Sequence, residues 1–512
     1  MYNSDIKRAW AYHDLTKHSP QSVRRNVHFL DWANQPLPFK IYRNLAPIAL
    51  PLETPSTGIA ALGAIGGQPV IRQGAVPALQ DLVQMFYYSA GITKRRQYPG
   101  GEILFRAAAC TGALYEIELH LVCGPLPDLG AGVYHFNPGD LALRRLREGD
   151  YRGVVAAATS WEAILARAPA MVISTGNYWR NAWKYQARTY RHFGWDNGTL
   201  HANVLAMAVA LGLPARLLCG FVDADINRLL ALETDREVAL AVVALGDPGA
   251  TSLPPPPPIE PLALETVPLS KREVDYPLMR EIHLASSLTA PEEVLSWRER
   301  PWPVSSLPSP TGKLTPLEPL SEQQIPSDTI EEVVLRRGST RRFSHAKITF
   351  AQLSTILDCA TRAIPADFSP PVGRHLNDLY LIVHAVEGLP PGTYFYHLAQ
   401  KSLECLKHGE FRGQAAFLAL EQDLAGDAAV EVFFLADLHQ WLARFGNRGY
   451  RAVQLEAGIL GGKMYLAAYA LRLGATGLTF YDDEVVQFFS PHAAEKSAIF
   501  LVALGHPAGK QR

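Results

Sequence analysis

The chain has 512 residues, a net charge of −1 and 48% hydrophobic residues. A chain of this length normally forms two or more domains, each with a substantial core. Because the charges balance, nothing in the composition attracts nucleic acid or an anionic membrane, and we expect neither as a partner.

The first residues are polar and mixed in charge, so we expect no secretory signal. No stretch approaches the roughly 18 unbroken apolar residues of a membrane span. Five cysteines lie far apart, without a CxxC or other metal-binding spacing. We therefore expect the reduced, mostly buried thiols of a cytoplasmic protein, and no metal site.

In the first half, residues 5–18 and 77–89 have the apolar spacing of amphipathic helices. Residues 26–75 between them are rich in Pro, Gly and Ala, and we interpret them as an extended arm or an insertion. The segment 105–124 begins with small residues, which leave backbone amides open to a planar or anionic ligand, and ends in a strand pattern.

Residues 198–211 are apolar nearly all round, which is typical of a central buried helix, and 239–245 form a buried strand pattern. From 247 to 326 the composition shifts to a Pro-rich connector that starts with five prolines at 254–258. Polyproline is semi-rigid, so a spacer is favoured over a recognition ligand. We expect one short helix inside the connector, around 291–297.

The order of the first half then returns. The matched segments are 350–361 with 77–89, 368–388 with 105–124, 391–406 with 130–146, 430–435 with the strand near 170, and 500–507 with the strand that ends at 246. One unit of roughly 200 residues is therefore used twice. We assign a first domain to 1–246, including the arm 26–75, a linker to 247–326 and a second domain to 327–512. Two such copies can pair through equivalent surfaces as an internal pseudo-dimer.

The head of the second copy carries four arginines around a Gly-Ser-Thr step, in the sequence RRGSTRR at 336–342. Arginine presents a planar fork of donors that fits a phosphate. Taken alone, the stretch is also compatible with a solvated basic end of a helix. Its place at the start of a repeated domain favours the phosphate site.

Five segments occur in a characteristic order: AACTGALYEIELHLV at 108–122, RRGSTRR at 336–342, an Arg-Glu-Ala-Gly helix at 451–458, 474–480, and VALGHPAGKQR at 502–512. This order resembles the flavin-dependent nitroreductase superfamily, in tandem form. The resemblance implies an α+β fold, with an antiparallel-rich mixed sheet flanked by helices, fused in two copies. It also implies FMN clefts that are each built by both copies. The segments 16–42 and 177–198 look more like the SagB/ThcOx branch, which includes dehydrogenases that oxidise peptide azolines to azoles.

The resemblance implies one complete FMN site, with residues from both copies. The second copy would bind the phosphate and ribityl chain through Arg336, Arg337, Ser339 and Arg341, with Lys510 or Arg512 also reaching the phosphate. Gly477, Leu478 and Thr479 would face the flavin edge. The first copy would cover the flavin with a small-residue loop that includes Ala109, Cys110, Thr111 and Gly112.

The other cleft departs from the family pattern. Its phosphate element would be the looser stretch Lys17–Arg24, and its covering loop, 369–375, carries the bulky Arg374 and His375. We therefore expect one FMN per chain and one degenerate cleft.

The implied activity is hydride transfer through flavin N5, with a small-molecule substrate and NAD(P)H as a possible donor. The sequence has no convincing G-x-G-x-x-G fingerprint, so we expect no dedicated dinucleotide domain. One alternative is a SagB/ThcOx-type dehydrogenase acting on a modified peptide, with Lys184 and Tyr185 as the general-base pair. Another is a flavin-binding or degenerate scaffold without turnover.

The chemistry of Lys184 and Tyr185 leaves a structural alternative open. A neighbouring cation can lower the pKa of a Tyr or Lys toward the working range. Tyr185 can instead belong to a polar network of Arg188, Tyr190 and Arg191 around Asp196. The matched positions of Asp196 and Glu456 favour ion pairs with the matched arginines.

Overall fold

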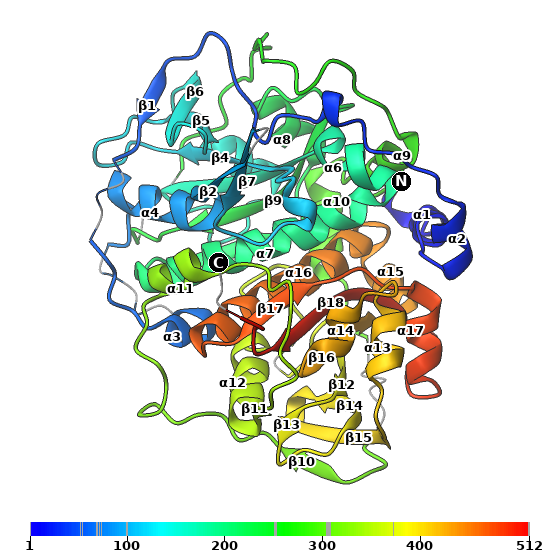
Figure 1. The fold of residues 1–512 in the computed structure, drawn as a ribbon. Coiled ribbons are helices and arrows are strands. Elements are labelled where there is room, and N and C mark those ends of the chain that lie inside the picture. Colours follow the sequence, from blue (N-terminus) through cyan, green and yellow to red (C-terminus); the bar gives the residue numbers. More distant parts are fainter. Residues whose placement is uncertain are drawn as a thin grey trace.

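The computed structural model describes residues 2–51, 53, 55–67, 70, 72, 74–98, 101–249, 253–303, 309–371 and 373–509. Two seven-stranded sheets, one from each half of the chain, lie on opposite sides of a central pair of long helices, α7 and α16 (Figure 1). Among the described residues, no helix has the length and hydropathy needed to cross a bilayer.

The first half contains eight α-helices and nine strands among its described residues. The helices are α1 (Lys7–Leu15), α2 (Pro20–Arg25), α3 (Ala61–Gly66), α4 (Leu79–Ala90), α5 (Arg152–Ala158), α6 (Tyr178–Tyr185), α7 (Thr189–Ala210) and α8 (Asp223–Leu229). The strands are β1 (Pro47–Ala49), β2 (Ile92–Tyr98), β3 (Gly101–Arg106), β4 (Ile117–Cys123), β5 (Gly132–Asn137), β6 (Ala142–Glu148), β7 (Ala170–Asn177), β8 (Ala215–Leu218) and β9 (Glu237–Leu245).

The rest of the described chain repeats this order. The helices are α9 (Pro277–Ala285), α10 (Pro291–Glu299), α11 (Ile330–Arg336), α12 (Phe350–Ala360), α13 (Arg412–Leu418), α14 (Asp423–Asp427), α15 (Leu438–Phe445), α16 (Arg448–Ala470) and α17 (Asp482–Phe489). The strands are β10 (Leu314–Pro316), β11 (Ile348–Thr349), β12 (Asp378–Val383), β13 (Val386–Glu387), β14 (Gly392–His397), β15 (Ser402–His408), β16 (Val430–Ala436), β17 (Gly474–Gly477) and β18 (Ser497–Gly505).

The two large sheets have the same topology. Their strand orders are β1-β6-β5-β4-β7-β9-β8 and β10-β15-β14-β12-β16-β18-β17, and all neighbours are antiparallel. Parallel strand pairing within the described chain is confined to the short β11–β13 ladder and two isolated bridges. The predicted α+β fold in two copies is therefore confirmed. Among the described residues, the hairpin β2–β3 has no counterpart in the second copy.

The two copies meet where α7 and α16 cross. A Cβ added at Gly198 would lie 2.5 Å from Gly458 Cα, so only glycine permits this approach of the two backbones. Near the crossing, Trp195 Nε1 donates a hydrogen bond of 2.6 Å to Gln454 Oε1. Both helices are buried over most of their length, as the nearly all-round apolar pattern at 198–211 predicts.

Buried ion pairs cross between the copies on both sides of this contact. Arg188 and Arg191 of the first copy bind Asp482 of the second, at 3.0 and 2.6 Å. In the mirrored arrangement, Arg448 and Arg451 of the second copy bind Asp223 of the first. Burial alone would raise the pKa of Asp482, but its two arginines hold that pKa well below its usual range. The arginines therefore do not pair with Asp196 or Glu456, which corrects the interpretation from their matched positions.

The Pro-rich connector contains more structure than the sequence indicates. The helix expected at 291–297 is present as α10, but α9 precedes it. The backbone oxygen of His283 on α9 accepts a hydrogen bond from Arg451, just as that of His13 on α1 accepts one from Arg191. The helix α9 is thus the counterpart of α1. We therefore propose that the second copy begins ahead of residue 277 rather than at 327.

We predict that Gly198→Ala destabilises the protein by about 1–3 kcal/mol, because the added methyl group forces α7 and α16 apart. Gly63→Ala in α3 is the matched control, since its Cβ would meet nothing within 4 Å. That control should be neutral or stabilising, by up to about 1 kcal/mol. Thermal unfolding midpoints compare the two variants, and a Gly198→Ala midpoint at or above that of wild type would contradict the account of the crossing.

Candidate functional site

The arginine-rich element follows α11, which begins at a capping box formed by Thr329 and Glu332. Its four arginines do not act as one group. Arg336 turns away into an ion pair of 2.9 Å with Asp328. Arg337 instead reaches the other copy, where Nε donates to the carbonyl of Ala107 at 2.8 Å and Nη2 to that of Arg106 at 3.0 Å. Arg337 therefore joins the second copy to the small-residue loop of the first.

Ser339 and the glycine-rich segment after α16 meet at one side chain that the sequence analysis did not identify. The hydroxyl of Tyr465 lies 3.4 Å from Ser339 Oγ and accepts a hydrogen bond from the backbone amide of Gly477. Two residues further on, Thr479 Oγ1 is buried and has no hydrogen-bond partner within the described part of the chain. An unpaired buried hydroxyl is costly unless a ligand completes its hydrogen bonding.

The small-residue loop of the first copy is held in a tight conformation. Gly112 has a φ of 64°, and Ala113 and Tyr115 also have positive φ values. The loop is fixed to α7 because Thr111 donates two hydrogen bonds to Asp196 Oδ1, from its backbone amide at 2.8 Å and its hydroxyl at 2.9 Å. Asp196 thus positions this loop.

The predicted pair Lys184 and Tyr185 ends α6, next to the same loop. A Cβ at Gly112 would lie 2.7 Å from the hydroxyl of Tyr185, and the ammonium of Lys184 lies 5.3 Å from the centre of the Tyr185 ring. Burial and the nearby Arg341 lower the pKa of Lys184. Burial, with Asp196 and its acidic neighbours, raises the pKa of Tyr185 well above the ordinary value. The expectation that a neighbouring cation makes this pair more acidic therefore holds for the lysine and not for the tyrosine.

Contacts link several of the predicted residues to one another where the two copies meet. Arg337 donates a hydrogen bond to the carbonyl of Ala107, in the loop that contains Ala109. The charge of Arg341 lowers the pKa of Lys184, and the hydroxyl of Tyr465 links Ser339 to Gly477. Arg336 is engaged elsewhere, and Lys510 and Arg512 lie outside the described residues.

At the predicted second cleft, the segment after β8 contacts the other copy. Leu217 at the end of β8 pairs with Ala366 of the other copy in a parallel bridge. The carboxylate of Asp367 then accepts the backbone amides of Cys219 and Gly220, both at 2.8 Å. In the first cleft the residues after the equivalent strand β17 are Leu478 and Thr479, at the predicted flavin edge. A ligand in the second cleft would have to displace the Asp367 carboxylate.

The stretch 17–25 is not the second phosphate element that the sequence analysis expects. Ser19 and Ser22 cap α2, and Lys17 pairs with Asp14 and Asp483. Ala75 bridges to Asp247 just as Phe343 bridges to Pro507. By this pairing Ala75 corresponds to Phe343, so the stretch 17–25 does not occupy the position of RRGSTRR.

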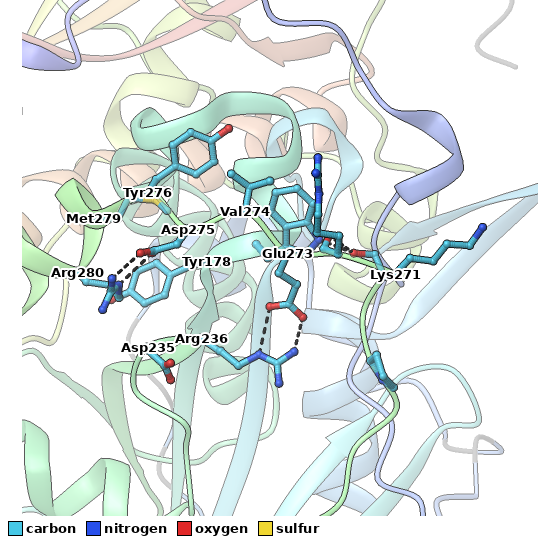
Figure 2. A pocket seen from close by; sticks show the side chains of 14 residues that line it. Tyr178, Asp235, Arg236, Lys271, Glu273, Val274, Asp275, Tyr276, Met279 and Arg280 are labelled. Carbon is cyan, nitrogen blue, oxygen red and sulfur yellow. Dashed lines mark hydrogen bonds and ion pairs between the residues drawn. The ribbon is translucent and has the colours of Figure 1, made fainter.

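A cavity of about 460 Å³ lies apart from the residues predicted to bind FMN (Figure 2). Tyr178 and Tyr276 line it together with the ion pairs Arg236–Glu273 and Arg280–Asp275. Its lining includes none of the residues that the sequence analysis assigns to catalysis or to FMN.

Comparison with known proteins agrees with the repeated architecture. A solved structure from Anabaena variabilis, described as a nitroreductase, is 28% identical, covers 98% of this chain and 99% of its own, and superposes with a TM-score of 0.78. A Methanocaldococcus jannaschii protein named as a nitroreductase is 29% identical over 161 residues, which is 30% of this chain and 81% of that protein. The trifolitoxin-processing protein TfxB of Rhizobium leguminosarum is 26% identical over 178 residues, covering 32% of this chain and 46% of that protein.

The family model for nitroreductases matches the chain twice, at residues 133–247 and 334–506, which together are more than half of its length. One match falls in each of the two copies. The chain therefore belongs to the nitroreductase family, as a tandem form with two copies of the fold.

Proposed function

We propose that this protein is an FMN-dependent oxidoreductase that holds one FMN per chain, in the cleft between RRGSTRR of the second copy and the small-residue loop of the first. The observation that carries the proposal is the contact of Arg337 with the carbonyls of Arg106 and Ala107, because it joins the two predicted halves of the site. Family membership supports the oxidoreductase class.

The donor groups around this cleft fit FMN. Arg341 is exposed and Ser339 half-buried, so a guanidinium and a hydroxyl are available to a phosphate. The buried hydroxyl of Thr479 lacks a partner among the described side chains and backbone groups, at the segment predicted to face the flavin edge. Bound FMN would supply the hydride chemistry, and the protein would supply its orientation and electrostatics.

Residues beside the small-residue loop would accept the proton that accompanies hydride transfer and donate hydrogen bonds. Lys184 has a lowered pKa and lies beside the loop, so its neutral amine is the better candidate for a base. Tyr185, whose pKa is raised, stays protonated at neutral pH and would act as a hydrogen-bond donor. Asp196 would hold the loop through Thr111.

A SagB/ThcOx-type dehydrogenase acting on a modified peptide is the second candidate. Its support is a basic residue with a lowered pKa beside the cleft, together with the similarity to a protein named as trifolitoxin-processing. NAD(P)H would be the electron donor in the nitroreductase-like case and would be unnecessary for azoline oxidation. A scaffold without turnover remains the third candidate, distinguished by the absence of flavin reduction by either substrate.

We predict that Arg341→Ala weakens FMN binding by about 1.5–3 kcal/mol, or roughly ten- to a hundredfold, because it removes a charge-assisted contact to the phosphate. Arg342→Ala is the matched control, since Arg342 is also exposed and lies next in the chain. Fluorescence titration of the flavin-free protein with FMN measures both. The double variant Arg337→Ala with Arg341→Ala should release FMN; a double variant that keeps it would place the phosphate site elsewhere.

We also predict a stoichiometry of one FMN per chain, because the Asp367 carboxylate occupies the amides of the second cleft. Flavin absorbance against protein concentration gives the ratio for the purified protein after saturation with FMN. A ratio near two would show that the second cleft opens, and colourless protein that takes up no FMN would remove both enzyme candidates.

If Lys184 is the base in azoline oxidation, the rate of flavin reduction should rise with pH through the pKa of Lys184. The sign follows because only the neutral amine accepts a proton, and its pKa lies below the ordinary lysine value of about 10.4. Lys184→Arg should lose this limb of the profile, whereas Tyr185→Phe should keep it at a lower rate. Anaerobic stopped-flow measurements on a peptide azoline test this, and an unchanged profile in Lys184→Arg would exclude the lysine as the base.

A further inference from the structure

Three side chains with metal-binding atoms meet beneath the small-residue loop. The ligand atoms of Cys110, Glu116 and Asp196 all lie within 4.8 Å of one another. Cys110 and Glu116 belong to the loop and its continuation, and Asp196 comes from α7. Both carboxylates are buried, with exposed fractions of 0% for Glu116 and 5% for Asp196.

This cluster lacks the cation that buried carboxylates normally require. Within the described ranges, no lysine, arginine or histidine forms an ion pair with Glu116 or Asp196. Glu116 Oε1 is moreover buried with no hydrogen-bond partner among the described groups. Two adjacent buried carboxylates without compensation are strongly unfavourable, so the site requires either a bound cation or a proton shared between the two carboxyl groups.

The single S–H group of Cys110 cannot donate hydrogen bonds to all of the oxygen atoms around it. Cys110 Sγ lies 3.4 Å from Glu116 Oε2, 3.5 Å from Asp196 Oδ2 and 3.8 Å from the carbonyl of Thr111. A single S–H proton serves one of these three oxygens and leaves the others unpaired. On its other side, the sulfur accepts the backbone amide of Tyr115 at 3.0 Å, a contact that favours a thiolate.

The two sulfur–oxygen separations are compatible with ligands around one metal ion. Tetrahedral zinc, with Zn–S near 2.3 Å and Zn–O near 2.1 Å, sets its sulfur and oxygen ligands about 3.5–3.6 Å apart. The observed separations of 3.4 and 3.5 Å agree with this edge. Further hydrogen bonds orient the ligands. The backbone amide of Thr111 donates one to Asp196 Oδ1, and the backbone amide of Tyr115 donates one to Cys110 Sγ.

A small cavity next to the cluster has room for a water ligand. A cavity of about 20 Å³, lined by Cys110, Asp196, Ala108 and Arg106 among others, adjoins the cluster. This volume is enough for one water molecule. Three protein ligands with one water is a common arrangement for zinc.

We propose that Cys110, Glu116 and Asp196 bind a divalent transition-metal ion of the zinc class, which fastens the small-residue loop to α7. This goes beyond the proposed flavin chemistry and does not depend on it. The sequence spacing gave no indication of the site, because its ligands come from a loop and a helix that only the fold brings together.

The competing arrangement is a proton shared between the two carboxyl groups. Burial and the charge of Glu116 raise the pKa of Asp196, and burial with Asp196 raises that of the Cys110 thiol. Elemental analysis and the Co²⁺ spectrum distinguish the two arrangements, because only the metal-bound arrangement gives a signal in them.

The test measures metal bound by the full-length protein, with its flavin, after incubation with Zn²⁺ and removal of excess ion. We expect close to one zinc per chain by elemental analysis. Replacement by Co²⁺ should give ligand-field bands at wavelengths beyond the flavin absorption. Cys110→Ser and Asp196→Asn should each weaken Zn²⁺ binding by about tenfold or more.

Cys405→Ser is the matched control, because Cys405 is also a half-buried free thiol but lies in the sheet of the second copy. It should keep the metal. The proposal is overturned if wild-type protein binds no Zn²⁺ or Co²⁺ above the Cys110→Ser level, which would leave the shared proton, or if Cys110→Ser retains full binding. Circular dichroism of each variant checks that the fold is intact, and retention of FMN is scored separately so that the flavin proposal stands or falls on its own.

Discussion

The close crossing of α7 and α16 determines the rest of the molecule. Because Gly198 and Gly458 allow the two backbones to approach, each copy of the fold reaches into the other on both sides of the contact. The arginines at the start of each central helix then pair with an aspartate of the opposite copy. The proposed FMN site therefore takes residues from both copies.

The surroundings of the two predicted clefts differ, although both lie where the copies meet. In the first, the residues proposed to face the flavin include an exposed arginine, a loop of small residues and a hydroxyl that has no hydrogen-bond partner among the described groups. In the second, Asp367 satisfies the amides of Cys219 and Gly220, and the ring of Trp297 packs against Gly220. A fused pair permits such a difference, because each half can change independently, whereas a homodimer must change both sites together.

Much of the fold could be predicted from the sequence, because the duplication shows the pattern of each helix and strand twice. Helices such as α4 and α12 and the strands of the sheet cores have strong periodicity, and their order recurs. The residues proposed for the first cleft came from the resemblance to the nitroreductase superfamily. The structure shows Arg337 in contact with the predicted loop, although Arg336 in the same motif is used elsewhere.

What the sequence did not predict depends on contacts between distant segments. The helix α9 lies in a Pro-rich stretch, and only its hydrogen bond to Arg451 identifies it as the counterpart of α1. The stretch 17–25 looks similar in composition to the arginine-rich element, yet strand pairing at Ala75 shows that it does not occupy the same position. The contact at the second cleft likewise depends on the hydrogen bond from the Cys219 amide to Asp367, which no local pattern indicates.

The measurement that tests the central claim most directly is a crystal structure of the protein saturated with FMN. The account predicts one flavin, with its phosphate at Arg341 and its ring under the loop at Gly112, and Asp367 still bound to the amides of Cys219 and Gly220. A flavin in the second cleft, or a phosphate held at 17–25, would contradict it.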